Sequence, residues 1–498
     1  MENLVKQYKE YLKKKQAYRH VMGVMNYDME TAMPKGGAED FAKTMGVLSE
    51  EVYKMETSEE LKALVRELYE HRDELDEITR REVEEHQESI ARIDCIPMEE
   101  YVDYDTTVSM ASSVWRKAKQ ENNYKLFEPY LKKIIEYNRK FALYYAPDKD
   151  PYDTLLDEYE KGMTKEKLDA FFAQIADAFR PLVEKTAAMK DKIDDSFLFK
   201  NYPVAEQDKL SRAVMKLMGI DENYCTLGEV EHPFTDNYSK HDVRITTHYH
   251  EDMLASSFYS VVHEGGHALY ELNTGDDLIG SPLASGASMG MHESQSRLFE
   301  NIIGRSYAFV KAIYPQIQEL FPEQLAGVTD VDFYKAVNKS VPSLIRTEAD
   351  ELTYCFHVMI RYELEKQLIA GTLSTEELPE RWNEMYEKYL GIRPSTDTEG
   401  CLQDSHWSGG SLGYFPSYAI GSAYGAQIMA SMKKDVDVDA CVAKGDLSPV
   451  NRWLTEKIWK YGTLKKPTEL IQNACGAAFD PKFYIEYMTA KYTELYGL

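Results

Sequence analysis

Residues 256–272, with the sequence SSFYSVVHEGGHALYEL, decide the fold class of this chain. The stretch contains no proline, and His263 and His267 lie four residues apart within it. Residues i and i+4 of an α-helix share one face, so both imidazoles can reach one tetrahedral zinc ion. Glu264 then projects beside the metal, where it can take a proton from water activated there. The stretch therefore predicts a helix that carries an HExxH metal site.

The HExxH pattern seldom arises by chance in a chain with few histidines. A chain with 12 histidines is expected to contain HExxH by chance only about 0.03 times. The alternative is a helix that merely carries two histidines. Gly265 and Gly266 each cost the helix roughly 1 kcal/mol relative to alanine. That cost suggests either close packing or a need for space near the metal.

A third ligand is needed, because catalytic zinc usually has three protein ligands and a water molecule. Glu293 lies 26 residues beyond His267, and His292 is the rival ligand beside it. The glycines within residues 286–290 predict a turn before a helix that begins near His292. We prefer Glu293 on this second helix, although carboxylate and imidazole both suit zinc.

Helical periodicity dominates the rest of the chain. Residues 58–92 are rich in charged residues and lack glycine and proline, which predicts an exposed helix, with a helical flap over a cleft as the alternative. Residues 243–247 alternate as a strand does. No segment has the composition of a linker between domains. We expect one mostly α unit over residues 1–498, with a small β element near the HExxH helix.

Charge and cysteine content restrict partners and location. The net charge of −26 disfavours binding to nucleic acid and to membrane surfaces, because both are anionic. No apolar run reaches the 18–20 residues or so of a membrane span, and residues 1–9 lack the apolar region of a signal peptide. We expect a cytoplasmic protein. The scattered cysteines are predicted to be reduced and buried: Cys95, Cys225, Cys355, Cys401, Cys441 and Cys475.

Six motifs occur in an order that resembles a known family. They are His232-Pro-Phe234, Asp242-Val-Arg244-Ile-Thr246, His263-Glu-Gly-Gly-His267, His292-Glu-Ser294, Ile345-Arg-Thr-Glu-Ala-Asp350 and Gly400-Cys-Leu-Gln-Asp-Ser-His-Trp407. They are similar to the HPF, DxRxT, HExxH, HES, IRxxAD and GxxQDxHW signatures of the thermostable carboxypeptidase 1 (carboxypeptidase Taq) family of metallocarboxypeptidases. Two positions depart from that pattern: Tyr27 replaces an expected tryptophan, and Asp40 replaces a more usual basic residue.

The resemblance implies a large, mostly helical metallopeptidase fold with a deep central groove, like that of neurolysin and angiotensin-converting enzyme. Residues 1–150 or so would form a flap or one wall of that groove. The implied activity is the stepwise release of amino acids from peptide C-termini, with broad side-chain tolerance. The implied assembly is a homodimer, and the implied metal is zinc, one Zn2+ per subunit, with Co2+ able to substitute.

Arginine is the residue best suited to hold the free C-terminal carboxylate of a peptide. Arg346 and Arg244 are the candidates, each inside a matching motif. Either could instead form a structural ion pair, for which Glu348 and Asp350 are possible partners of Arg346.

Other site residues are assigned by similarity to the helical zinc peptidases. His406 and Tyr418 are expected to donate hydrogen bonds to the oxyanion, with Tyr414 as the substitute for Tyr418. His232 either binds substrate or is structural. Asp404 is expected to orient a ligand histidine or His406.

Two other classes of function remain as alternatives. A zinc endopeptidase or dipeptidyl carboxypeptidase would use the same HExxH site and differ in what holds the C-terminal side of the substrate. A helical binding protein with a structural zinc is disfavoured, because such sites usually close with a fourth protein ligand.

Overall fold

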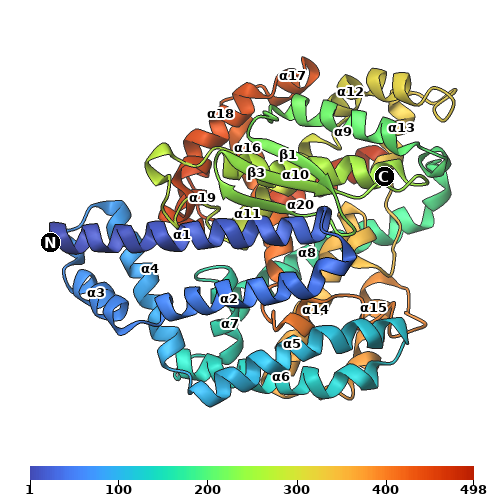
Figure 1. Cartoon of the computed structure of the whole chain (residues 1–498). Helices are drawn as coiled ribbons and strands as arrows, with labels where there is room; N and C mark the ends of the chain where they lie inside the picture. The colour runs from blue at the N-terminus through green and yellow to red at the C-terminus, as the bar shows by residue number, and fades with distance from the viewer.

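The computed structural model describes residues 1–498 and is mostly helical, with one small sheet, as predicted (Figure 1). The first ten helices are α1 (Glu2–Thr31), α2 (Ala38–Glu56), α3 (Glu59–Glu70), α4 (Glu77–Asp94), α5 (Met98–Gln120), α6 (Tyr124–Tyr145), α7 (Pro151–Tyr159), α8 (Lys165–Ala188), α9 (Val204–Met218) and α10 (Leu254–Leu272). The others are α11 (Met289–Arg297), α12 (Tyr307–Leu320), α13 (Asp330–Val337), α14 (Glu351–Ala370), α15 (Leu378–Leu390), α16 (Pro416–Met432), α17 (Val438–Ala443), α18 (Ser448–Lys457), α19 (Pro467–Cys475) and α20 (Lys482–Tyr496). The strands are β1 (Cys225–Glu229), β2 (Thr235–Ser239) and β3 (Asp242–Thr247).

Helix α10 is the helix predicted at residues 256–272, and its glycines serve close packing. A Cβ atom on Gly266 would lie 2.7 Å from the carbonyl oxygen of Gln295 and 2.7 Å from the Cα of Ser296 on α11. A Cβ atom on Gly265 would lie 2.8 Å from the terminal methyl of Met218 on α9. The two backbones of α10 and α11 can approach only because no side chain separates them.

Helix α11 also packs closely against α16. A Cβ atom on Gly421 would lie 2.7 Å from the Cβ and Cγ atoms of Glu293, and one on Gly425 would lie 3.1 Å from the carbonyl oxygen of Ser294. Helix α16 is buried along nearly its whole length. Its small residues therefore fix the position of the helix that carries Glu293.

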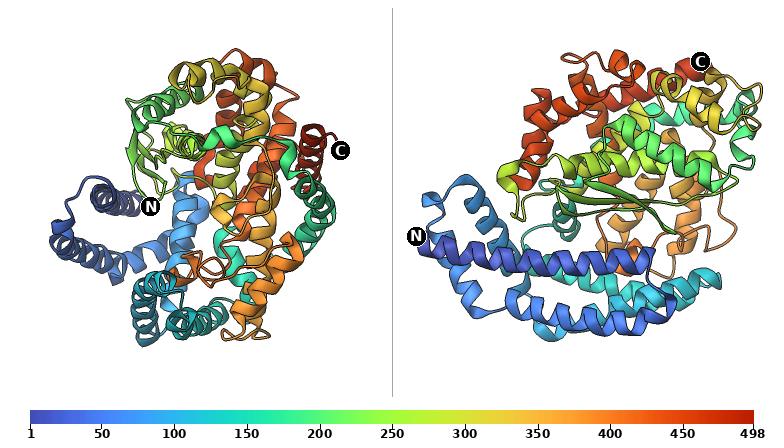
Figure 2. Two further views of the ribbon diagram at one scale, coloured as in Figure 1. Left: turned by 90° about the vertical axis from the view of Figure 1, so that its right-hand side faces the viewer. Right: turned by 45° about the horizontal axis from the view of Figure 1, so that its top comes forward.

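The sheet has the strand order β1-β3-β2, with β1 parallel and β2 antiparallel to β3. The predicted strand at residues 243–247 is β3, and its Val243 and Ile245 are fully buried. Figures 1 and 2 show the sheet between α10 and α1, and α10 contacts both β2 and β3. The sheet thus connects the HExxH helix to the N-terminal helices.

Residues 58–92 form two helices, α3 and α4, rather than one exposed helix. The break occurs because Asp76 caps α4 and accepts a hydrogen bond from the backbone of Thr79 at 3.0 Å. The helices are also less exposed than predicted, because they share a second apolar cluster with α1: Tyr8, Leu12, Leu61, Val65, Leu68, Val83 and Ile90. Figure 2 shows these N-terminal helices at one side of the molecule.

The main core is a cluster of 98 buried residues, far larger than the N-terminal cluster of seven. No helix combines the length and the apolar character that crossing a membrane would require. All six cysteines are free, and three of them, Cys225, Cys355 and Cys401, are buried. Cys95 is exposed and Cys441 and Cys475 are half-buried, which differs from the prediction that every cysteine is buried.

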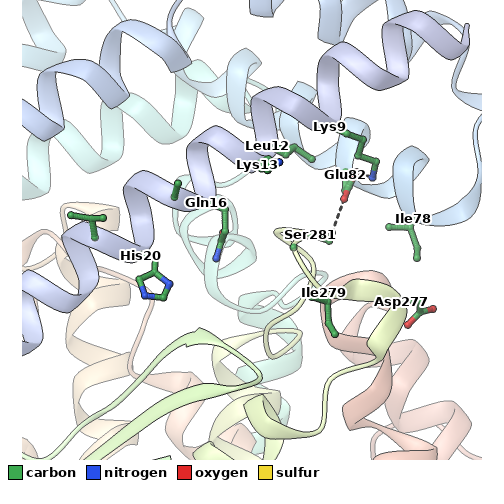
Figure 3. Close-up of a pocket in the computed structure, with 13 residues that line it drawn as sticks. Lys9, Leu12, Lys13, Gln16, His20, Ile78, Glu82, Asp277, Ile279 and Ser281 are labelled. Atoms are coloured by element: carbon green, nitrogen blue, oxygen red, sulfur yellow. Dashed lines mark hydrogen bonds and ion pairs between the residues drawn. The ribbon is translucent and has the colours of Figure 1, made fainter. Parts of the chain in front are cut away.

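A cavity of about 760 Å³ lies between α1, α4 and the loop that follows α10 (Figure 3). Lys9 on α1 forms an ion pair with Glu82 on α4 at 2.5 Å, and Ser281 of the loop donates a hydrogen bond to Glu82 at 2.7 Å. These polar contacts join the N-terminal helices to the main body at this edge.

Candidate metal centre and active site

Three side chains from α10 and α11 converge on one point. The Nε2 atoms of His263 and His267 lie 3.6 and 3.4 Å from Oε2 of Glu293. All three potential ligand atoms lie within 4.8 Å of one another. Two imidazoles and one carboxylate form a donor set that suits a catalytic zinc ion, and the set has no fourth protein ligand that would close it.

Arg297 and Ser296 hold the carboxylate of Glu293. Arg297 donates from Nε to Oε1 at 2.7 Å, and Ser296 donates from its hydroxyl to Oε2 at 2.9 Å. Burial alone would raise the pKa of Glu293, but the Arg297 guanidinium and the two histidines hold it well below its ordinary range. Glu293 is therefore ionised, with Oε1 occupied by Arg297 and Oε2 directed at the histidines.

Glu300 orients the first histidine. Its Oε2 lies 2.8 Å from Nδ1 of His263. Burial would raise the pKa of Glu300, but Arg297, His263 and Arg305 lower it to about 2. A carboxylate on Nδ1 places the proton there and leaves the Nε2 lone pair for a metal. Sequence reasoning missed Glu300 because it lies on a π-helix, Leu298–Ile303, whose side-chain spacing differs from that of an α-helix.

His292 lies beside the second histidine and does not point at the convergence point. Its Nδ1 atom is 2.5 Å from Nδ1 of His267, and its Nε2 atom is 2.6 Å from Oε1 of Glu271. Because both nitrogens of His292 are engaged, the geometry favours Glu293 over His292 as the third ligand. Burial lowers the pKa of His267 to about 3, so His267 is neutral, as a metal ligand must be.

Glu264 lies on the same helix as the histidines and is buried. Its Oε2 accepts a hydrogen bond from the hydroxyl of Thr235 at 2.5 Å. Burial raises the pKa of Glu264, and the nearby His263 opposes that change. Thr235 was not predicted, although its position directly after the His232-Pro-Phe234 motif is a signal that could have indicated it.

Arg346 lies at the start of the segment Arg346–Glu348 and is paired differently from the prediction. Its Nε donates to Oδ1 of Asp404 at 3.0 Å, and its Nη1 donates to the hydroxyl of Tyr354 at 3.0 Å. Asp350, a predicted partner, instead caps α14. Arg361 donates from Nε to Oδ2 of Asp404 at 2.6 Å.

Asp404 was expected to orient a histidine, and it lies between two arginines instead. Burial would raise the pKa of Asp404, but Arg361 and Arg346 hold it well below its ordinary range. Two guanidinium groups share this single carboxylate, so the cluster carries one net positive charge. Sequence reasoning missed Arg361 because it lies in the middle of α14, outside every motif.

His406 and Tyr418 are brought together beside Arg346. His406 Nε2 lies 3.1 Å from the hydroxyl of Tyr418, and the Arg346 guanidinium lies 4.9 Å from the centre of the Tyr418 ring. The Tyr414 ring lies 5.3 Å from the rings of both His406 and Tyr418. Burial and the charge of Arg346 lower the pKa of His406 to about 4, so this imidazole is neutral near pH 7.

Tyr354 connects this cluster to the metal ligands. Its hydroxyl accepts the hydrogen bond from Arg346, and its ring lies 4.4 Å from the guanidinium of Arg297. Arg297 in turn holds Glu293. An unbroken chain of contacts therefore runs from the candidate carboxylate-binding arginine to the candidate metal ligand.

Arg244 lies on β3 and His232 in the turn before β2, and neither is among the residues that converge at the candidate metal site. Arg244 forms a bidentate ion pair with Asp242 at 2.9 and 3.0 Å, and its guanidinium lies over the rings of Tyr27 and Tyr238. It thereby joins β3 to α1. His232 is exposed in the turn between β1 and β2.

Comparison with known proteins gives concordant findings over the whole chain. The family described as carboxypeptidase Taq (M32) metallopeptidase matches residues 7–492. Carboxypeptidase 1 of Bacillus subtilis is 42% identical and covers 99% of both chains. Thermostable carboxypeptidase 1 of Pyrococcus furiosus is 36% identical and covers 96% of both chains. The crystal structure of an M32 carboxypeptidase from Deinococcus radiodurans superposes with a TM-score of 0.96 at 34% identity, covering 100% of both chains.

Proposed function

The chain belongs to the carboxypeptidase Taq (M32) family of metallopeptidases and is a metal-dependent carboxypeptidase, and we propose that its metal is zinc, held by His263, His267 and Glu293. The observation that carries this proposal is the convergence of two imidazole Nε2 atoms on one carboxylate oxygen at 3.6 and 3.4 Å. Cobalt can substitute in such a donor set.

Arg297 and Ser296 orient the Glu293 carboxylate that would hold the metal. Arg297 donates to Oε1 of Glu293 and Ser296 donates to Oε2, and Oε2 is the oxygen that faces both histidines, so Oε2 would be the atom offered to the metal. A zinc ion held by these two imidazoles and one carboxylate would keep an open position for water, as catalytic sites with three protein ligands do. When bound, zinc supplies a Lewis acid that lowers the pKa of a water molecule towards about 7.

Glu264 moves the proton in the proposed reaction. Its carboxylate accepts the proton of the attacking water and returns it to the nitrogen of the departing amino acid. The hydroxyl of Thr235 holds Oε2 of Glu264, which restricts the rotamer of this base. Burial raises the pKa of Glu264, which brings its basicity closer to that needed near neutral pH.

His406 and Tyr418 are the proposed donors to the developing oxyanion, with Tyr414 as the alternative to Tyr418. His406 is neutral near pH 7 because its pKa is lowered to about 4 by burial and by Arg346. A neutral imidazole next to a tyrosine hydroxyl can donate a hydrogen bond without placing a further charge in the site. Arg244 on β3 and His232 in the turn between β1 and β2 are proposed to contribute to substrate binding only.

Arg346 is the proposed partner of the substrate's C-terminal carboxylate. The cluster of Arg346, Arg361 and Asp404 has one positive charge in excess, which favours an anion. Asp404 and Tyr354 fix the guanidinium of Arg346, so little entropy is lost when a carboxylate binds. This excess charge supports the removal of terminal residues over cleavage at internal bonds.

Assembly and location are further proposals. We expect a homodimer, to be checked by light scattering of the purified chain, with residues 1–498 forming one catalytic unit. Its partners are peptides with a free C-terminus. The absence of any disulfide among the six cysteines supports a reducing compartment such as the cytoplasm.

The test uses a matched pair of peptides, one with a free C-terminus and one amidated, incubated with zinc-loaded enzyme. We expect single amino acids to be released from the free acid only. Equal cleavage of both peptides at internal bonds would contradict the role of Arg346 and favour an endopeptidase.

Arg346→Met should raise KM for the free acid about 10- to 100-fold, since a hydrogen bond to a charged group contributes about 1.5–3 kcal/mol. The matched control is Arg393→Met, which removes an arginine paired with Glu380 and Glu387 at the surface. Equal KM values for Arg346→Met and Arg393→Met would contradict the proposed carboxylate site.

A further inference from the structure

We propose that Glu271 and His292 are positioning residues that together orient His267 towards the metal, as a two-member relay. This inference rests on the proposed metal site. His267 has no carboxylate of its own on Nδ1, whereas His263 has Glu300 at 2.8 Å. The relay gives His267 the same support through one intervening imidazole.

Glu271 is the fixed end of the relay. It is only 3% exposed, at the C-terminal end of α10. Its Oε1 accepts hydrogen bonds from the hydroxyl of Ser285 at 3.0 Å and from the backbone N–H of Gly286 at 3.2 Å, and its Oε2 accepts from the amide of Asn237. A group surrounded by donors in this way acts as an acceptor, so His292 must donate to it from Nε2.

The positions of the protons follow from this contact. With its proton on Nε2, a neutral His292 presents a lone pair at Nδ1. The Nδ1 atom of His267, 2.5 Å away, must then carry the proton that fills the contact. His267 is left with its lone pair on Nε2, the atom that faces Oε2 of Glu293 at 3.4 Å. The relay therefore selects the tautomer of His267 that can bind a metal.

The His292 ring is held in place from two further sides. Gly286 lies so close to the ring that a Cβ atom on it would collide with Cδ2 of His292. The ring of Tyr270 lies 5.3 Å from that of His292. These contacts pack the imidazole while its two nitrogens contact Glu271 and His267.

Two variants of His292 separate the relay from simple packing. In His292→Asn, Oδ1 takes the place of Nδ1 and can still accept the proton of His267. In His292→Gln, the amide nitrogen takes the place of Nε2, so the contact with Glu271 survives and the acceptor for His267 is lost. Glutamine is closer in size to histidine, so a packing role favours His292→Gln, whereas the relay favours His292→Asn.

The measurement is the zinc dissociation constant of the metal-free chain, from competition with a chromophoric chelator. We expect His292→Asn to lie within about threefold of the wild type and His292→Gln to bind zinc about 10- to 100-fold more weakly. His292→Leu, which has no polar group, should match His292→Gln. The visible spectrum of the cobalt-loaded chain should be shifted in the Gln and Leu variants and retained in the Asn variant.

His248→Gln is the matched control, because His248 is a half-buried histidine bonded to the carbonyl of Val230 and has no contact with the relay. Its zinc affinity should equal that of the wild type. Equal zinc affinities for His292→Asn and His292→Gln, or tighter binding by His292→Gln, would overturn the relay while leaving the metal site intact. A wild-type chain that takes up no divalent metal would overturn the metal site and the relay with it.

Discussion

The helices around the proposed metal ligands and the N-terminal helices are built in opposite ways. Helix α16, which supports Glu293, is buried along its length except at Tyr418 and Ala430. Helix α1, with 30 residues, buries only Tyr8 and Leu12. In the first region backbones touch through glycines, and in the second a small apolar cluster and polar contacts hold the helices.

This contrast indicates which helices hold the proposed metal ligands in position. Ligands must be held within a fraction of an ångström for metal binding, which a close-packed trio of helices can achieve. The N-terminal helices carry none of the three proposed ligands. We therefore expect changes around α10, α11 and α16 to impair hydrolysis, and changes among α1 to α4 to leave the metal site intact.

The largest effect should come from Glu264→Gln, a change of one atom in the close-packed region. Because it removes the group that accepts the proton without altering the shape of the side chain, kcat should fall about 10³-fold or more. Zinc content, measured by atomic emission on the dialysed protein, should equal that of the wild type. A Gln variant with near-normal turnover would remove Glu264 from the mechanism.

Adding one carbon atom in each region compares them directly. Gly421→Ala places a Cβ atom where the Cβ and Cγ of Glu293 lie 2.7 Å away, so α11 must shift and zinc affinity should fall about tenfold. Gly46→Ala, within α2, meets no atom within 4 Å. It should raise stability by about 0.5–1 kcal/mol through helix propensity and leave zinc affinity unchanged.

Thermal unfolding and zinc competition on both variants test this comparison. If Gly421→Ala bound zinc as tightly as Gly46→Ala, close packing on Glu293 would not be what fixes the ligand. If Gly46→Ala weakened zinc binding, the N-terminal helices would be coupled to the site, and the contrast between the two regions would fail.

Glu160 makes the close-packed region sensitive to pH. It is buried between α7, the first turn of α11 and α16, and accepts hydrogen bonds from Gly290 N–H at 3.2 Å and from the hydroxyl of Tyr424 at 3.0 Å. Burial raises its pKa from 4.5 to about 7. Between about pH 4.5 and 7, Glu160 is protonated in the folded chain and ionised in the unfolded chain. The contribution of protonated Glu160 to the free energy of unfolding is therefore complete below about pH 4.5 and is lost as the pH rises through 7.

Above pH 7, the free energy of unfolding of Glu160→Gln should therefore exceed that of the wild type by on the order of 2 kcal/mol, and the variant should unfold at a higher temperature. The advantage should shrink as the pH falls from 7 to 5. Glu494→Gln, an exposed change on α20, controls for the loss of one negative charge. Parallel pH profiles for Glu160→Gln and Glu494→Gln would contradict this account.

The amino-acid sequence predicted the parts of the site that depend on local spacing. The i and i+4 spacing of His263 and His267 indicated one helix face, and the glycines before Glu293 indicated a second helix. The three potential ligand atoms lie within 4.8 Å of one another. The strand at residues 243–247 was likewise visible from its alternation, and it forms the central strand of the sheet.

The supporting residues could not be predicted, because they depend on tertiary contacts. Glu300 reaches His263 only through a π-helix, and Thr235 reaches Glu264 only through the register of β2 against β3. The break between α3 and α4 was missed for a different reason. Asp76 is an ordinary N-cap residue, but within a run of charged residues its capping signal is hard to distinguish from a solvated face.

The smallest effect on the metal site should come from Leu68→Ala in the N-terminal cluster. Removing a fully buried leucine side chain costs about 2–5 kcal/mol, which is large for a cluster of seven residues. We expect α1 to α4 to open locally, seen as faster amide hydrogen exchange in residues 1–94, with zinc affinity within about twofold of the wild type.

Leu364→Ala, a fully buried leucine of the main core on α14, is the matched control and should accelerate exchange across the main core. If Leu68→Ala weakened zinc binding as much as Gly421→Ala, the metal site would depend on the N-terminal helices after all. The accuracy of the site would then be a property of the whole chain rather than of three close-packed helices.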